Sequence, residues 1–357
     1  MKALAWIPSA KCVREVDRPQ PGLRAADEVV VRMRLGGLCG TDREIVNHSL
    51  GKPPRDTEYL VMGHEALGEI VEVGKDVQGL REGDPVSIMP RRPCVAYCYQ
   101  CRQGRADLCE TGQCLEAGIF RRHGFFAEYV VEPARYVFLL SQSLGAAGVL
   151  LEPASVCVKT LRRISTARQA LFGTPRGRKL LILGAGPIGI LTALFASLDG
   201  YDVWVESLES PESWPAQVVQ EADILYASSG RLEAVGFDTL IDCTGHPTAM
   251  VEHLPYLAHN SIIALVGAAP CGKKHKVDMG RLLTDAALKN QVFLGIVNAG
   301  FDSWQDASRR LEKINARSPA ILRALITSRL KWPQAPEAFL KRQPGEIKSV
   351  IEFPVSK

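Results

Sequence analysis

Residues 180–189 read LLILGAGPIG, and this run decides the fold of the second half of the chain. Its apolar start predicts a buried strand, and the glycines that follow predict a tight turn before an apolar helix. The GxGxxG motif comprises Gly184, Gly186, Pro187, Ile188 and Gly189. In this strand–turn–helix context it predicts dinucleotide binding, because the glycines admit a pyrophosphate to the backbone at a helix N-terminus. The alternative is a structural turn in an α/β protein without nucleotide.

Apolar strands alternate with helical stretches around this run, which is the pattern of a parallel sheet covered on both faces. The expected strands cover residues 202–205, 237–242, 262–266 and 292–297, a helix covers 156–170, and a loop covers 173–177. The first part of the chain instead holds short alternating strands such as 28–34 and 66–73. A helix at 303–316 and a strand at 349–353 follow. We therefore expect a mostly-β domain of residues 1–165 and 299–357, and a dinucleotide-binding domain of residues 166–298.

The composition is that of a soluble globular protein, with 357 residues, 46% hydrophobic and 23% charged. The formal net charge is only +4, and basic residues are scattered among acidic ones, so neither a nucleic-acid nor a membrane partner is expected. The N-terminus lacks a signal-peptide pattern, which favours a cytoplasmic location. Residues 180–198 lack charge and could span a membrane by length, but the internal glycines and proline favour a strand, a turn and a helix.

A second group of residues offers metal ligands. Cys39, His64 and Glu65 lie within 27 positions and supply a thiol, an imidazole and a carboxylate, the ligand types that bind zinc. Each also has a plainer explanation, because free cysteines are often buried in cores and a His-Glu pair is often a solvated surface pair. These residues alone do not decide between the two interpretations.

The cysteines indicate a second metal site. A C-x3-C-x2-C-x7-C pattern comprises Cys94, Cys98, Cys101 and Cys109. Four thiolates so close in sequence predict a closed, structural zinc site, with an iron–sulfur cluster or four unrelated thiols as alternatives. In a reducing compartment we expect no disulfide framework. The remaining cysteines are expected to be packing residues, namely Cys12, Cys114, Cys157, Cys243 and Cys271.

The end of the strand at 202–205 should select the cofactor. Glu206 lies 22 residues after Gly184, near the spacing of a carboxylate that binds an adenosine ribose. Residues 207–210 contain no arginine for a 2′-phosphate, and a carboxylate would repel that phosphate, so NAD is favoured over NADP. The alternative is that Glu206 points to solvent and Ser207 faces the ribose.

Taken together, the sequence resembles the zinc-containing medium-chain dehydrogenases, with the closest match to their glucose dehydrogenase branch, over essentially the whole chain. The resemblance rests on CGTDREIVN at 39–47, CETG at 109–112, EAGI at 116–119, GIVN at 295–298 and GEIK at 345–348, with GHE at 63–65 and EP at 152–153. It implies an α/β protein with a GroES-like, mostly-β catalytic domain and a Rossmann domain with a doubly wound parallel sheet.

The resemblance also implies roles for individual residues. Cys39 and His64 would bind a catalytic zinc, and Glu65 and Glu152 would complete or exchange in its shell. Thr41 would relay a proton from the reacting hydroxyl. Zinc supplies a Lewis acid for that hydroxyl, and the nicotinamide accepts the hydride.

Further residues follow from the same comparison. Glu116 would lie near a sugar hydroxyl, Asn298 would lie near the nicotinamide, and Thr244 is assigned to the cofactor site. Two sugar contacts of the branch are missing, since an acidic residue is replaced by Val156 and an asparagine by Pro90. The Asn-Arg-Arg that the branch uses for NADP is replaced by Ser207-Leu208-Glu209.

The expected function is therefore zinc-dependent transfer of a hydride from a sugar, cyclitol or modified sugar to a nicotinamide cofactor. A secondary-alcohol or amino-alcohol dehydrogenase is the alternative, because Val156 and Pro90 make the pocket less polar. An alternative of another class is a catalytically silent nucleotide-binding protein. The resemblance further suggests a homodimer or homotetramer.

Overall fold

A computed structural model describes residues 1–357 except 49, 175–176, 233–235, 268–273 and 355–357. Part of the expected 173–177 loop, and Cys271, lie outside the described residues. The chain forms two compact units: unit 1 comprises Met1–Glu152 and Gly300–Lys357, and unit 2 comprises Pro153–Ala299. The first boundary lies before the expected one at residue 165, near the start of the helix α3 (Leu151–Phe172).

Unit 1 is built mainly from antiparallel strands, in agreement with its alternating sequence. Its largest described sheet runs in the order β11 (Val137–Leu139), β6 (Pro85–Ile88), β5 (Glu65–Val73), β3 (Glu28–Leu38), β19 (Lys348–Glu352) and β18 (Ile326–Lys331), and β10 (Tyr129–Pro133) also pairs with β3. Smaller sheets comprise β2 (Cys12–Asp17), β1 (Lys2–Ile7) and β4 (Leu60–Val61), and β7 (Arg91–Arg92), β8 (Leu115–Ala117) and β9 (Arg121–Arg122). The C-terminal strand β19 thus returns to pair with β3.

Helices of unit 1 connect and cover these strands. They are α1 (Gly40–His48), α2 (Tyr99–Arg102), α8 (Phe301–Arg317), α9 (Pro319–Ala324) and α10 (Ala335–Ala338), with short 3-10 turns at Ala106–Leu108, Ala134–Tyr136, Gln142–Leu150 and Trp332–Gln334. The core includes Trp6, Phe126, Phe339 and Phe353, so aromatic rings from both ends of the chain pack together. This packing ties the C-terminal segment to the N-terminal strands.

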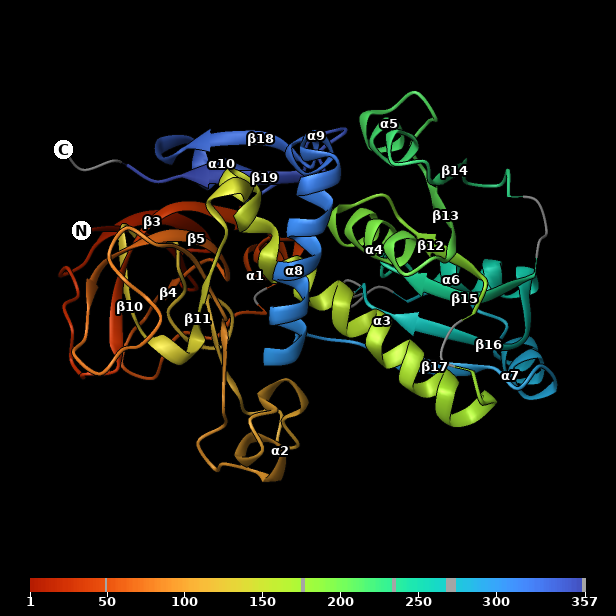
Figure 1. Cartoon of the computed structure of the whole chain (residues 1–357), viewed down its shortest axis with the longest axis horizontal. Helices are drawn as coiled ribbons and strands as arrows, with labels where there is room; N and C mark the ends of the chain where they lie inside the picture. Colours follow the sequence, from red (N-terminus) through yellow and green to blue (C-terminus); the bar gives the residue numbers. More distant parts are fainter. Residues whose placement is uncertain (49, 175–176, 233–235, 268–273, 355–357) are drawn as a thin grey trace. The chain divides into compact units, whose positions relative to one another are not determined.

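Unit 2 contains a parallel sheet (Figure 1). Its described strands run in the order β14 (Leu225–Ser228), β13 (Asp202–Ser207), β12 (Lys179–Leu183), β15 (Phe237–Asp242), β16 (Leu257–Leu265) and β17 (Val292–Gly295). The helices are α3, α4 (Pro187–Leu198), α5 (Trp214–Glu221), α6 (Pro247–His253) and α7 (Met279–Leu288), with a 3-10 turn at Leu254–Tyr256. From β12, the next two strands in sequence (β13 and β14) add on one side and the following three (β15, β16 and β17) add on the other. This is the strand order of a Rossmann fold. The predicted α/β fold is confirmed.

The uncharged stretch at 180–198 folds as a strand, a turn and a helix, as expected. It forms most of β12, the glycine turn and the buried helix α4. The core of unit 2 includes Leu181, Phe237 and Ile263 from three neighbouring strands. Apolar side chains from neighbouring strands therefore pack together in the core of the unit, as the sequence pattern indicated.

Candidate active site and cofactor site

The three candidate ligands of the catalytic metal come together in unit 1. Ligand atoms of Cys39, His64 and Glu65 all lie within 4.8 Å of one another, and His64 and Glu65 are buried. Cys39 lies between β3 and α1, and Glu65 begins β5. Gly37 leaves room for the carboxylate, because a Cβ there would lie 2.1 Å from Glu65 Oε2. Gly63, at φ +88°, sets the turn before His64 in a conformation that favours glycine.

Neighbouring groups orient these ligands. Asp42 Oδ2 accepts a hydrogen bond from the Cys39 backbone N–H at 2.9 Å, and Asp42 Oδ1 lies 3.4 Å from His64 Nδ1. The Cys39 thiol donates to Thr41 Oγ1 at 3.7 Å. Burial opposes protonation of His64, but the negative charges of Asp42 and Cys39 outweigh it and raise the pKa of the imidazole. A pocket that favours positive charge and offers sulfur, nitrogen and oxygen donors fits a zinc ion.

Lys348 is a member of this site that the sequence reasoning missed. Its Nζ donates to both carboxylate oxygens of Glu65 at 2.7 Å and to the Leu38 carbonyl at 3.2 Å. Both side chains of the ion pair are 1% exposed. In this structure, therefore, the Glu65 carboxylate is held by a buried lysine, whereas the sequence suggested only zinc as its partner.

Two more carboxylates lie close to this cluster. Glu152, at the start of α3, is buried, and burial raises the pKa of its carboxyl to about 7, with the charges of Glu65 and Glu116 acting in the same direction. Glu116 on β8 is also buried, and it accepts a hydrogen bond from Arg91 Nη2 on β7 at 2.6 Å. Glu152 thus interacts electrostatically with His64, Glu65 and Glu116, and the roles that the resemblance implied for Glu116 and Glu152 stay predictions.

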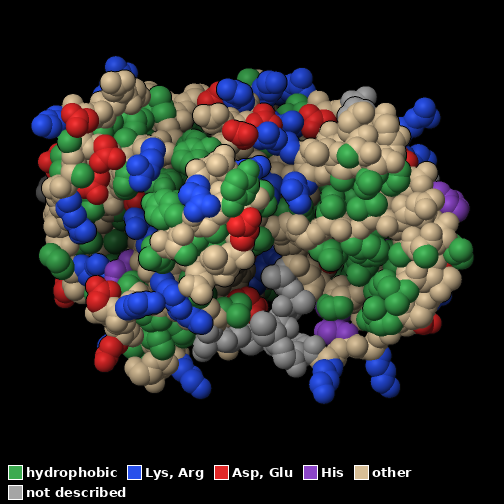
Figure 2. Space-filling model, turned by 90° about the horizontal axis from the view of Figure 1, so that it is seen from below, with side chains coloured by type: hydrophobic (Ala, Val, Ile, Leu, Met, Phe, Trp, Pro, Cys, Tyr) green, Lys and Arg blue, Asp and Glu red, His purple; other side chains and the backbone are tan. Residues whose placement is uncertain are grey.

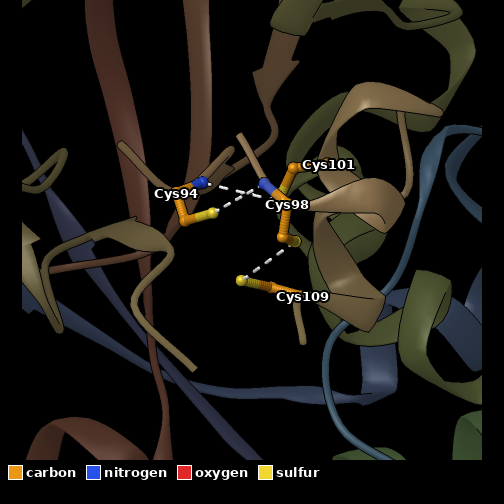
Figure 3. Close-up of side chains that lie close together, drawn as sticks. All are labelled: Cys94, Cys98, Cys101 and Cys109. Carbon is orange, nitrogen blue, oxygen red and sulfur yellow. Dashed lines mark hydrogen bonds between the residues drawn. The ribbon is translucent and has the colours of Figure 1, made fainter. Parts of the chain in front are cut away.

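The four remaining predicted ligands form one cluster around α2 (Figure 3). The sulfur atoms of Cys94, Cys98, Cys101 and Cys109 lie within 4.8 Å of one another. Hydrogen bonding from the Cys98 backbone lowers the pKa of the Cys94 thiol to about 6, whereas burial raises that of Cys101 to about 12. The Cys94 backbone N–H also donates to Cys101 Sγ at 3.4 Å. Four sulfurs that face one another fit a closed tetrahedral zinc site.

The other cysteines are unrelated to this cluster. None of the nine described cysteines forms a disulfide. Cys114 and Cys157 are buried, as expected for packing residues, and Cys12 and Cys243 are partly buried.

The glycine turn of unit 2 has the geometry of a dinucleotide-binding loop. Gly184 has φ +99°, and Gly186 is the N-cap of α4, which has Pro187 in its first turn. A Cβ on Gly189 would lie 1.9 Å from the Gly184 carbonyl oxygen, so glycine permits the helix to pack closely on the strand. Thr244 lies beside this turn, since its Cγ2 would be 3.0 Å from a Cβ on Gly184. The loop therefore offers backbone N–H groups to a pyrophosphate.

Glu206 differs from its sequence-based interpretation. Its carboxylate is 3% exposed and lies 2.7 Å from His253 Nε2, a side chain of α6 that the sequence interpretation did not include. Ser207 donates instead to the carboxylate of Glu209. The histidine was not foreseen because it lies 47 positions away in sequence. Because the carboxylate is buried, the alternative that Glu206 points to solvent is wrong, and its contact with a ribose stays a prediction.

Asn298 follows β17 and has an unusual backbone. It adopts φ +53°, is buried, and its Oδ1 accepts a hydrogen bond from the Ala299 N–H at 2.8 Å. This arrangement fixes the side chain locally; its predicted place near the nicotinamide remains a prediction.

Comparison with known proteins identifies the class. The family described as "Glucose dehydrogenase C-terminus" matches residues 145–353, and "Alcohol dehydrogenase GroES-like domain" matches residues 25–142. The chain therefore belongs to the zinc-containing medium-chain dehydrogenases, which are NAD(P)-dependent enzymes that act on sugars and other alcohols.

Its place within that class follows from individual relatives. The chain is 33% identical to the glucose 1-dehydrogenase of Methanocella arvoryzae, with 99% of each covered, and 35% identical to that of Thermoproteus tenax, with 97% and 96% covered. Among solved structures, Haloferax mediterranei glucose dehydrogenase in complex with NADP, Zn and gluconolactone is similar, with a TM-score of 0.88, 26% identity and both chains fully covered. The chain belongs to the glucose dehydrogenase branch.

Proposed function

We propose that this enzyme oxidises a ring hydroxyl of an aldose-like sugar, cyclitol or modified sugar and passes the hydride to a nicotinamide dinucleotide. The observation that carries the proposal is the pair of buried carboxylates, Glu116 and Glu152, beside the Cys39, His64 and Glu65 cluster. A substrate with several hydroxyl groups can donate hydrogen bonds to carboxylates beside the candidate metal ligands, whereas a simple alcohol has a single hydroxyl to offer.

The residues of unit 1 have distinct proposed roles. Cys39 and His64 would hold zinc, which supplies a Lewis acid that favours loss of the hydroxyl proton. Thr41, already hydrogen-bonded to Cys39, would carry that proton away. Arg91 would hold Glu116 in place for a second hydroxyl of the substrate. The products are then the carbonyl compound or lactone, the reduced cofactor and one proton.

A substrate panel tests this proposal. Purified enzyme is supplied with NAD or NADP and with aldoses, polyols and simple secondary alcohols, and kcat/KM is compared. We expect an aldose or related cyclic polyol to be preferred. We also expect Cys39→Ser to lose turnover and Cys12→Ser, a change on β2 outside the ligand cluster, to retain it. A preference for simple secondary alcohols would support the alternative that Pro90 and Val156 favour, and turnover in Cys39→Ser would refute the zinc chemistry.

We further propose that NAD is preferred to NADP. Leu208 is 89% exposed and Glu209 follows it, so the end of β13 presents an apolar side chain and a carboxylate where the branch uses arginines for a 2′-phosphate. The Haloferax relative was solved with NADP, so this chain would differ from it. The ratio of kcat/KM for the two cofactors tests the proposal: we expect NAD to be favoured and the Leu208→Arg/Glu209→Arg variant to shift the ratio toward NADP. A native preference for NADP would contradict it.

We also propose that two copies pair through β17. This strand is the edge of the described sheet, and Phe293 on it and Val297 beyond it are exposed. On α7, Met279 and Leu283 are exposed one helical turn apart. Hydrophobic side chains also gather on the face shown in Figure 2. An edge strand of this kind is stabilised by pairing with a second copy. Light scattering should give a dimer or tetramer that Phe293→Lys weakens, and a monomeric parent protein would refute the proposal.

A further inference from the structure

Glu206, at the end of β13, contacts both the glycine loop and the helix α6. The backbone carbonyl of Glu206 accepts a hydrogen bond from the N–H of Gly184 at 2.7 Å, which fixes the first glycine of the dinucleotide loop. The carboxylate of the same residue lies 2.7 Å from His253 Nε2, at the end of α6. Glu206 therefore links the glycine loop to α6.

The chemistry of this contact indicates a charged pair. The second ring nitrogen of His253, Nδ1, lies 2.6 Å from the carbonyl oxygen of Ala249, which can only accept a hydrogen bond. Glu206 can also only accept when ionised, so both ring nitrogens must carry a proton for both contacts to form. Burial opposes this charge, but the hydrogen bond to Glu206 outweighs it and raises the pKa of His253. The negative charge of Glu206 is therefore neutralised within the protein.

The other end of α6 is also fixed near the dinucleotide loop. Thr244, which precedes the helix, donates through its N–H and Oγ1 to Asp242 Oδ1, at 2.8 and 2.6 Å. Its methyl group lies against Gly184. The segment from Thr244 to His253 is thus attached to β15 at one end and to β13 at the other, on both sides of the loop that receives the pyrophosphate.

We propose that Glu206 and His253 are positioning residues that hold the glycine loop and α6 in the shape that binds a dinucleotide, and that they do not read the 2′ position of the ribose. The proposal deepens the proposed cofactor use and rests on it. The pair should contribute equally to the binding of NADH and NADPH, because it acts on the loop that receives the pyrophosphate common to both. Discrimination between the two would then fall to residues 207–209.

Fluorescence titration of NADH and of NADPH with the full-length protein tests this inference without any sugar substrate. In Glu206→Gln and in His253→Gln, we expect both dissociation constants to rise by about 10-fold and their ratio to stay within about 2-fold of the parent value. The KM for the cofactor should rise in the same proportion. A purely structural role would reduce the fraction of folded protein but leave the dissociation constant of the folded fraction unchanged.

The double variant Glu206→Gln/His253→Gln keeps the test decisive if a single variant unfolds, because it contains no unpaired buried charge at this position. A shift of the ratio toward NADPH in the single or double variants would make Glu206 a reader of the ribose and overturn the proposal. Unchanged affinity for both cofactors would overturn it as well. If the parent protein bound neither cofactor, the proposed function would fail together with this inference, whereas failure of the sugar panel alone would leave this test intact.

Discussion

Replacing Lys348 by methionine should lower the free energy of unfolding by about 3–5 kcal/mol, because it removes one partner of a buried ion pair and leaves the other charge uncompensated. The ion pair between Lys348 and Glu65 is almost completely buried. Both side chains are 1% exposed, Lys348 Nζ contacts both oxygens of Glu65 at 2.7 Å, and no solvent reaches the carboxylate to replace the lysine. For a unit of roughly 200 residues, this loss corresponds to a fall of about 6–20 °C in melting temperature.

Urea unfolding followed by circular dichroism, together with thermal melting, measures the effect. Arg329→Met is the matched control, because Arg329 on β18 pairs with Glu352 on β19, the strand that also carries Lys348, but both side chains are exposed. It should change stability by less than about 1 kcal/mol. The double variant Lys348→Met/Glu65→Gln should recover most of the loss, because neither member of the pair is then charged. A Lys348→Met protein as stable as Arg329→Met would refute the reasoning, as would a double variant no more stable than Lys348→Met.

Three further substitutions have defined outcomes. Gly189→Ala should weaken NADH binding by at least about 10-fold in a fluorescence titration, because the added methyl group would meet the Gly184 carbonyl; unchanged binding would contradict the loop geometry. Asp42→Asn should lower zinc affinity by about 10–100-fold in a chelator competition, since Asp42 orients His64 and Cys39, and parent-like affinity would exclude that role. Cys94→Ser should release one zinc per chain and lower the melting temperature; an unchanged zinc content would mean that the four cysteines bind no zinc.

The fold was largely predictable because its signals are local. Residues 237–242 form β15 with the expected bounds, and the glycine turn opens α4 as expected. The helix α3 begins at Leu151, before the expected start at residue 156, and it contains Pro153 in its first turn. Proline is tolerated there because its missing N–H has no intrahelical partner. The strand β14, with the sequence LYAS, was missed because its short, mixed sequence lacks a strand-like pattern.

The two clusters of candidate metal ligands could be predicted for the same reason, since thiol and imidazole groups at short spacing carry their chemistry in the sequence. Their partners were not. Lys348 lies 283 positions from Glu65, and nothing in the residues around either one indicates that they meet. The pairing of Glu206 likewise depends on where α6 ends in three dimensions. Spacing from the glycine motif located the residue correctly but could not reveal which group its carboxylate contacts.

Metal analysis combined with turnover tests the central claim most directly. We predict two zinc ions per chain in the parent enzyme, one in Cys39→Ser, and loss of nicotinamide-dependent sugar oxidation with the missing ion. Parent-like zinc content and turnover in Cys39→Ser would contradict the assignment of the Cys39, His64 and Glu65 cluster as the catalytic zinc site.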